Sequence, residues 1–286
     1  MTVVTRFAPS PTGELHLGSA YSARIAWRRA RDVGGTFLVR IEDIDIRRCR
    51  REYETAMLAD LQWLGLAWDG EVRRQSDHFA DYGRVMDQLD ARGLVYPCFC
   101  TRADIAASTS APHPTTMGPD GPLYPGTCRH LSNEERRRRI SAGVEHCMRF
   151  DSARAAEQAG PYSFVDETLG RIEGQPLLMG DFVIARKDTP TSYHLSVTVD
   201  DHLQGVTLAG GALAAGIGVD TIAEQRVGEI GGAAFDMAEQ PPPDGQLFFP
   251  VHGRSVSPSR GSRNSNRRSF RTLPPVSSRS RATPGR

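Results

Sequence analysis

The sequence contains almost no lysine: Lys187 stands alone beside 34 arginines. This imbalance indicates a coding bias toward arginine more than a need for bidentate contacts at every site. Cysteine is scarce and odd in number, with five in 286 residues, and no apolar N-terminal segment resembles a signal peptide. We therefore expect reduced thiols and a cytoplasmic location. No apolar run approaches the roughly 20 residues that span a bilayer, so we expect no membrane partner.

Charge is distributed unevenly along the chain. The formal net charge is +1, but nine arginines and no acidic residue lie in 254–286, which leaves residues 1–253 at −8. Periodicity fades from about residue 208, and beyond residue 252 the Arg/Ser/Pro-rich sequence cannot offset the entropy of ordering. We predict a folded domain over 1–207 and a largely disordered tail over 208–286. An RNA-binding arm is the alternative for the tail, since dispersed arginines can contact phosphate without folding.

The first part of the chain has the pattern of a βαβ unit. Residues 2–7 form a short run rich in β-branched side chains before a Pro/Gly turn, an amphipathic helix follows residue 16, and TFLVRIEDID has strand character. Helical patterns then cover YETAMLADLQWLGL and HFADYGRVMDQLDARG. A parallel sheet is therefore the expected arrangement.

The second part of the chain is less regular. The stretch APHPTTMGPDGP has neither helix nor strand signal, and we expect it to be a mobile insertion. Residues 146–206 contain short strand-like runs, notably FVIAR and SYHLSVTVDD, which predict that a sheet resumes there.

The segment APSPTGELHLGS places phosphate-binding chemistry directly after the first strand. Its prolines and Gly13 shape a rigid loop, and His16 can donate to a phosphate. Gly18, at the start of the following helix, allows close approach of a nucleotide near the positive end of the helix dipole. On its own, HLGS is short enough to recur by chance, so a turn with an incidental histidine is the alternative.

Two neighbouring segments make the pattern specific: RFAPSP lies directly upstream, and LVRIEDID ends the next strand. Together they resemble the class I aminoacyl-tRNA synthetases of the glutamate branch, in which HLGS is a form of the HIGH motif. The resemblance covers about residues 3–207 and runs through WLGLAWDG, QSDHFADY, GLVYPCFCTR, GDFVIARKD and SYHLSVTVDDHLQGVT. It implies an α/β, Rossmann-type catalytic domain with ligands at the carboxyl ends of its parallel strands.

The resemblance also implies roles for individual residues. The catalytic set is His16, Gly18 and Ser19. The glutamate-binding set is Arg6, Phe7, Ala8, Pro9, Ser10, Glu42 and Tyr193. Arg6 offers a bidentate guanidinium to a carboxylate, and Glu42 would hold the substrate ammonium. Without the resemblance, a solvated strand end and an ordinary packed tyrosine would explain Glu42 and Tyr193.

A cysteine-bearing segment follows GLVYP, with a C-x-C at residues 98–100 and Y-x-x-x-C at residues 124–128. Thiolates suit a closed tetrahedral zinc site, but from spacing alone unpaired thiols are an equal alternative. The arrangement resembles the zinc element of the glutamyl-queuosine tRNA(Asp) synthetases, a group in which tyrosine is the fourth ligand. It implies a structural Zn²⁺ in an insertion over about 96–130, held by Cys98, Cys100, Tyr124 and Cys128. The competing candidates, ranked below Tyr124, are His113, His130 and Cys147.

The resemblance stops abruptly after Thr207. Relatives continue into V-R-G-x-D-L, whose arginine helps to hold glutamate, whereas Gly211 stands at that position here. The KMSKS element, whose lysine stabilises the β- and γ-phosphates, has no counterpart, because no lysine follows Lys187. We hypothesise a single-base frameshift near codons 208–210, with a genuinely divergent tail as the alternative.

The resemblance implies a function. The chain would activate glutamate with ATP and Mg²⁺, then transfer it to queuosine in the anticodon of tRNA(Asp), acting as a monomer. The alternatives are a fragment of an ordinary glutamyl-tRNA synthetase and an inactive glutamate-, ATP- or RNA-binding pseudoenzyme. The short chain favours the queuosine-directed enzyme, because an ordinary synthetase needs a further anticodon-binding domain.

Overall fold

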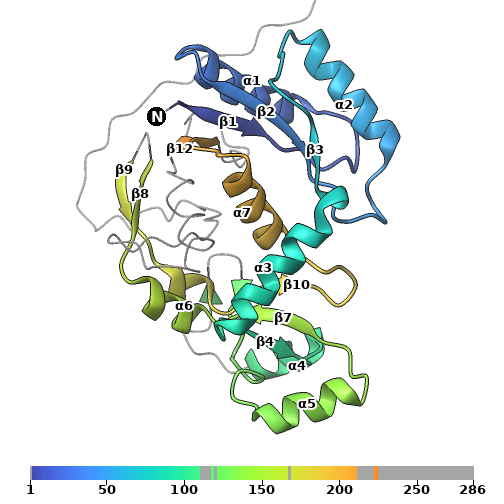
Figure 1. Ribbon diagram of the computed structural model, residues 1–286, viewed down its shortest axis with the longest axis vertical. Helices are drawn as coiled ribbons and strands as arrows, with labels where there is room; N and C mark the ends of the chain where they lie inside the picture. Colours follow the sequence, from blue (N-terminus) through green and yellow to red (C-terminus); the bar gives the residue numbers. More distant parts are fainter. Residues whose placement is uncertain (1, 110–116, 119–120, 167–168, 211–221, 225–286) are drawn as a thin grey trace, which may run out of the picture. The chain divides into compact units, whose positions relative to one another are not determined.

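The first sheet is parallel, as the βαβ pattern predicts. The computed structural model describes residues 2–109, 117–118, 121–166, 169–210 and 222–224 (Figure 1). Strands β1 (Val4–Phe7), β2 (Thr36–Ile41) and β3 (Arg73–Arg74) pair in the order β1-β2-β3. The register sets residues 4–7 of β1 against residues 36–39 of β2. The carboxyl ends of β1 and β2 therefore meet at one edge, where RFAP and RIED lie.

Two helices pack against this sheet, α1 (Leu17–Arg31) and α2 (Arg51–Trp63). Both were expected from their apolar periodicity. Alanines of α1 allow the helix to approach the strands closely, and larger side chains fill the space toward α2. The buried cluster consists of Phe7, Ala23, Ala26, Ala30, Phe37, Val39, Leu61 and Leu66. Each large side chain in such a cluster contributes about 1.5–3 kcal/mol through burial.

A second sheet is antiparallel, with the order β10-β7-β4. Its strands are β4 (Val95–Cys98), β7 (Cys147–Phe150) and β10 (Val183–Ala185). The predicted helix α3 (Phe79–Ala91), preceded by the 3-10 turn η1 (Gln75–His78), packs onto this sheet beside α6 (Ser152–Ala159) and α7 (Tyr193–Leu203). Their common core consists of Tyr82, Val85, Leu89, Leu94, Val95, Phe150, Ala155, Tyr162, Ile184, Leu195 and Val199.

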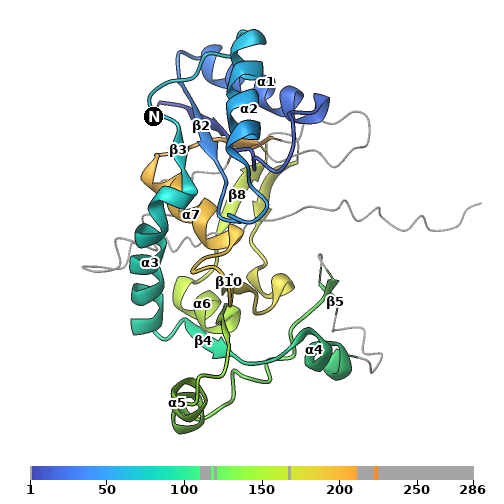
Figure 2. The same cartoon turned by 90° about the vertical axis from the view of Figure 1, so that its right-hand side faces the viewer.

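The strand prediction for SYHLSVTVDD is wrong. The segment forms helix α7 (Tyr193–Leu203), which lies beside α3 in both views (Figures 1 and 2). The hydroxyl of Ser192 caps the helix by accepting a hydrogen bond from the backbone N–H of Leu195 at 3.4 Å. The β-branched run V-T-V favours a strand by propensity. Burial of Leu195 and Val199, four residues apart on one helix face, overrides that preference.

The insertion contains more regular structure than its composition suggested. Helices α4 (Arg102–Thr109) and α5 (Asn133–Ser141) flank a hairpin of two-residue strands, β5 (Met117–Gly118) and β6 (Gly121–Pro122). The expectation of no strand in APHPTTMGPDGP is therefore corrected at the hairpin, and residues 110–116 and 119–120 lie outside the described part.

A third sheet has the order β11-β12-β8-β9. Strands β8 (Ser163–Asp166) and β9 (Gly170–Glu173) form a hairpin, followed by the 3-10 turn η3 (Pro176–Met179). Two strands belong to the region that we expected to be a disordered tail, β11 (Ala209–Gly210) and β12 (Ile222–Glu224). Leu208 and these five residues are the part of the predicted tail that the structure describes, and the largely disordered character of the tail stays a prediction.

Thr207 and Leu208, just before β11, join the first sheet. The N–H of Thr207 donates to the carbonyl of Val4 at 2.9 Å, and Leu208 bridges Thr5 in parallel. Leu208 and Ala209 are both buried. Packing thus continues two residues beyond the predicted boundary at 207. Among the helices that the structure describes, none has the length and apolar character to cross a membrane.

Candidate active site and metal centre

Arg6, the predicted carboxylate-binding residue at the end of β1, is held by a carboxylate far away in sequence. Its Nε and Nη2 donate to Oδ1 and Oδ2 of Asp201 on α7, both at 3.0 Å. Burial alone would lower the pKa of Arg6, but the charge and hydrogen bonds of Asp201 raise it above its ordinary value. The same contacts outweigh burial at Asp201 and lower the pKa of its carboxyl. The pair is therefore ionised on both sides.

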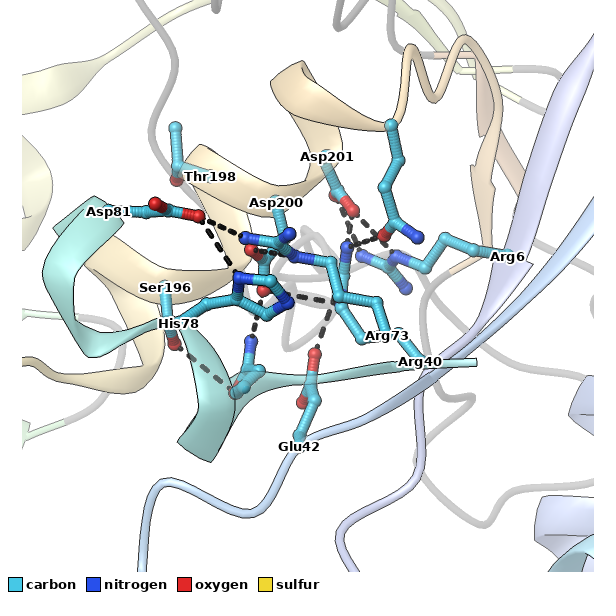
Figure 3. Close-up of polar contacts among 12 residues, drawn as sticks. Arg6, Arg40, Glu42, Arg73, His78, Asp81, Ser196, Thr198, Asp200 and Asp201 are labelled. Atoms are coloured by element: carbon cyan, nitrogen blue, oxygen red, sulfur yellow. Dashed lines mark hydrogen bonds and ion pairs between the residues drawn. The ribbon is translucent and has the colours of Figure 1, made fainter. Parts of the chain in front are cut away.

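A second arginine, Arg40 of β2, lies fully buried between three carboxylates (Figure 3). Its guanidinium reaches Asp201 at 2.7 Å, Glu42 at 3.5 Å and Asp200 at 3.8 Å. Its Nη1 donates to the side chain of Gln204 at 2.9 Å. A buried charge is tolerated only when it is paired and hydrogen-bonded, and Arg40 meets this condition through α7.

Asp200, the neighbour of Asp201, serves a different set of groups. It accepts hydrogen bonds from Nε of Arg73 at 2.7 Å, from the amide of Gln75 at 2.8 Å and from the hydroxyl of Tyr82 at 2.9 Å. The two adjacent carboxylates of α7 thus bind different partners. One faces the predicted substrate arginine, and the other ties α7 to β3, η1 and α3.

Glu42, the predicted ammonium ligand, lies at the end of β2 near Arg6 and is 7% exposed. Burial raises the pKa of its carboxyl, while the charges of Arg40 and Arg6 oppose this effect. Tyr193, at the start of α7, is 40% exposed. Burial and the charge of Glu42 raise the pKa of the Tyr193 phenol, and Arg6 lowers it. The charges of Arg6 and Glu42 thus both act on the Tyr193 phenol.

The remaining residues of the predicted glutamate set lie on the loop that leaves β1. Phe7 is buried in the core under the sheet, so its side chain serves packing. The carbonyl of Pro9 accepts a hydrogen bond from the N–H of Glu42 at 2.9 Å, which fixes this loop to the end of β2. Ala8 is partly buried, and Ser10 is exposed. Their contact with a substrate stays a prediction.

The three residues of the predicted catalytic set meet at the start of α1. His16 caps the helix, with Nδ1 accepting from the N–H of Ser19 at 3.2 Å and Nε2 lying 3.0 Å from the hydroxyl of Ser19. A Cβ at Gly18 would lie 3.2 Å from the His16 ring, so glycine leaves room for the ring. His16 is exposed and the first turn carries no acidic side chain, which suits an anion. In this arrangement the histidine contacts its own helix, and donation to phosphate stays a prediction.

The predicted metal ligands come together. The sulfurs of Cys98, Cys100 and Cys128 lie within 4.8 Å of one another. The hydroxyl of Tyr124 lies 3.3 Å from Sγ of Cys98 and 3.4 Å from Sγ of Cys100, and the two sulfurs of Cys100 and Cys128 are 3.5 Å apart. Tetrahedral zinc, with Zn–S of about 2.3 Å and Zn–O of about 2.0 Å, sets ligand separations of about 3.5–3.8 Å. The donor set and its spacing therefore fit zinc.

Polar neighbours surround the sulfurs of this centre. The N–H of Phe99 donates to Sγ of Cys128 at 3.4 Å. Sγ of Cys147, opposite Cys98 on the paired strand β7, donates to the backbone carbonyl of Cys98 at 3.7 Å. Cys147, Tyr124 and Arg149 lower the pKa of the Cys98 thiol to about 4 against the effect of burial, whereas burial raises the pKa of the Cys100 thiol to about 11. The guanidinium of Arg149 also lies over the Tyr124 ring, 3.8 Å from its centroid. Of the competing ligand candidates, His130 and Cys147 stay outside the three-thiol group, and His113 lies outside the described residues.

Comparison with known proteins identifies the family of the chain. Residues 2–209 match the family model for the catalytic domain of class I tRNA synthetases (E and Q). The chain belongs to this family. The family match ends within two residues of the point where the resemblance in the sequence stops. ATP, an amino acid and tRNA are the substrates of these synthetases, and the predicted class of enzyme is confirmed.

Similar relatives of the family have more specific names. Over 210 residues the chain is 47% identical to a glutamyl-Q tRNA(Asp) synthetase of Rhodobacter capsulatus, a match that covers 72% of this chain and 74% of the relative. A second protein of that name, from Symbiobacterium thermophilum, is 44% identical over 73% of this chain and 65% of the relative. A solved glutamate tRNA ligase of Elizabethkingia meningosepticum, in complex with its amino acid, matches with a TM-score of 0.60 and 26% identity over 73% of this chain. The match spans 43% of that ligase.

Sequence reasoning missed several residues of the site. Arg40 stands within the quoted RIED segment, and Asp200 and Asp201 stand within VTVDD, but none was given a role. The sequence features that could have identified them are an arginine within an otherwise apolar strand segment, TFLVRI, and two adjacent acidic residues that directly follow the apolar run VTV. Buried charges of this kind require partners.

Proposed function

We propose that this chain activates glutamate with ATP and transfers the glutamyl group to queuosine in tRNA(Asp). The observation that carries the proposal is the position of Arg6 and Glu42 at the carboxyl ends of the paired strands β1 and β2, where the charges of both side chains act on the Tyr193 phenol. One cationic, one anionic and one phenolic group suit an amino acid that bears both carboxylates and an ammonium. The names of the relatives quoted above support the choice of tRNA.

The first step is an attack of the substrate carboxylate on the α-phosphorus of ATP. A C–O–P linkage forms, the bond from the α-phosphorus to the bridging oxygen breaks, and pyrophosphate leaves with Mg²⁺. In this proposal Arg6 binds a substrate carboxylate and Glu42 the ammonium, so that the reacting carboxylate is oriented. The start of α1, with His16 and Ser19, faces the phosphates, where its N–H groups and dipole stabilise the negative charge.

The same proposal assigns a structural Zn²⁺ to Cys98, Cys100, Tyr124 and Cys128. The metal would join β4 to the segment around Cys128. These two segments also contribute to one small buried cluster, which consists of Tyr96, Cys98, Phe99 and Cys128. A site with four protein ligands leaves no open position for a substrate. The metal would therefore supply folding free energy to the insertion.

Transfer of labelled glutamate tests the proposal. With ATP, the full chain should join glutamate to tRNA(Asp) that bears queuosine, and not to the same tRNA without queuosine or to tRNA(Glu). Charging of tRNA(Glu) would instead support an ordinary glutamyl-tRNA synthetase fragment. Binding of glutamate or ATP without any transfer would support a pseudoenzyme. This outcome is included because no lysine follows Lys187 to form a KMSKS element.

A further inference from the structure

The inference concerns Asp201, which no sequence motif assigned to the substrate site. Its side chain is 4% exposed, and it comes from α7, 195 residues beyond Arg6. Both of its oxygens contact the Arg6 guanidinium, on the Nε and Nη2 side of the fork. Two parallel contacts fix the plane and the rotation of a guanidinium, which a single contact does not.

The orientation of the Arg6 guanidinium determines which of its N–H groups can donate to a ligand. Because Asp201 occupies Nε and Nη2, the Nη1 end of the guanidinium is turned away from Asp201. Glu42 and Tyr193 also act electrostatically on Arg6. In the proposed function, the Nη1 end of the guanidinium, which the two contacts with Asp201 do not use, binds the substrate carboxylate.

Arg40 holds Asp201 in turn. Its Nη2 lies 2.7 Å from Oδ1 of Asp201, and its side chain is fully buried. Glu42 and Asp200 also approach Arg40, at 3.5 and 3.8 Å, so the positive charge of Arg40 is shared among three carboxylates. Arg40 thus fixes the carboxylate that in turn fixes Arg6.

We propose that Asp201 is a positioning residue of the glutamate site, which orients Arg6 for the substrate carboxylate while Arg40 holds Asp201 in place. This rests on the proposed function, because Arg6 is taken as the carboxylate-binding residue. Asp201 itself does not touch the substrate. Its replacement should weaken glutamate binding by misorienting Arg6, and it should leave the ATP site at the start of α1 unchanged.

The test compares two neighbouring carboxylates of α7. Asp201→Asn keeps the shape of the side chain but removes its charge, and Asp200→Asn does the same to a buried carboxylate that holds Arg73, Gln75 and Tyr82. Pyrophosphate exchange is measured on the full chain as a function of glutamate and of ATP, together with Tm. We expect both variants to lower Tm. Asp201→Asn should raise KM for glutamate at least about tenfold with KM for ATP unchanged, whereas Asp200→Asn should not separate the two KM values.

Asp201→Glu provides a second variant in case Asp201→Asn does not fold. It keeps the charge and displaces the carboxylate by one methylene, so KM for glutamate should again rise more than KM for ATP. The inference is overturned if the wild-type chain exchanges and the folded Asp201 variants leave KM for glutamate unchanged, or change both KM values as Asp200→Asn does. If the wild-type chain neither exchanges nor binds glutamate, the proposed function is overturned and the inference falls with it.

Discussion

The hydroxyl of Tyr82 on α3 donates a 2.9 Å hydrogen bond to the carboxylate of Asp200 on α7, across 118 residues of sequence. Both side chains are fully buried. The contact ties the helix that carries the catalytic domain's acidic pair to the core of the second sheet. Burial, and then the charge of Asp200, raise the pKa of the Tyr82 phenol, so the phenol remains the donor.

Removal of this donor should destabilise the fold. In Tyr82→Phe, Asp200 keeps its contacts with Arg73 and Gln75 but loses one of three donors. A hydrogen bond to a charged group contributes about 1.5–3 kcal/mol, and the free energy of unfolding should fall by that amount. Urea denaturation measures the change. Tyr53→Phe on α2 is the matched control. An equal fall in the free energy of unfolding in both variants would show that the hydrogen bond from Tyr82 to Asp200 does not stabilise the fold.

Binding of glutamate should depend on pH through Glu42. Burial raises the pKa of this carboxyl above its ordinary value of 4.5. The ionised form, needed to hold an ammonium, is therefore lost at a higher pH than for an exposed glutamate. KM for glutamate should rise as the pH falls through that raised pKa, by up to about tenfold per unit below it.

The acidic pair on α7 provides the contrast for this pH dependence. The pKa of Asp201 is lowered, so the Arg6 contact persists while Glu42 takes up its proton. Glu42→Gln should bind glutamate weakly and with a KM that no longer varies with pH. Pyrophosphate exchange measured between pH 5 and 8 tests this assignment. If KM for glutamate still varies with pH in Glu42→Gln, a group other than Glu42 is responsible for the titration.

Metal content should distinguish the fourth ligand. Cys128→Ser should reduce zinc from about one ion per chain to almost none and should lower Tm, because three-coordinate sites hold zinc poorly. Tyr124→Phe should weaken zinc binding, and Cys147→Ser should retain the metal. Mass spectrometry of the metal in each purified variant gives the answer. Retention in Tyr124→Phe with loss in Cys147→Ser would reverse the assignment.

The reading frame after Thr207 offers a prediction at the level of the gene. The family match ends at residue 209, and no lysine follows Lys187. Translation of the other two frames downstream of Thr207 should reveal V-R-G-x-D-L followed by a lysine-bearing loop. Their absence from both frames would establish the present C-terminal sequence as a divergent tail.

The sequence predicted those parts of the fold that local patterns encode. The βαβ unit and α3 were predictable from apolar periodicity, and the cysteine pattern identified three sulfurs that do meet. Helix α7 was not, because V-T-V has strand propensity and only contacts with α3 and the second sheet reveal its helical face. The roles of Arg40 and Asp201 were also hidden, since Arg40 bonds to Gln204, and Asp201 to Arg6, across more than 150 residues of the chain. No local pattern specifies a contact over that distance.

Pyrophosphate exchange without tRNA tests the central claim most directly. The full chain is incubated with ATP, Mg²⁺ and labelled pyrophosphate, beside a chain in which the reading frame is restored after Thr207. The account predicts label in ATP that depends on glutamate, with a stronger signal from the restored chain. Label that appears equally without glutamate, or only when tRNA(Glu) is added, would contradict it.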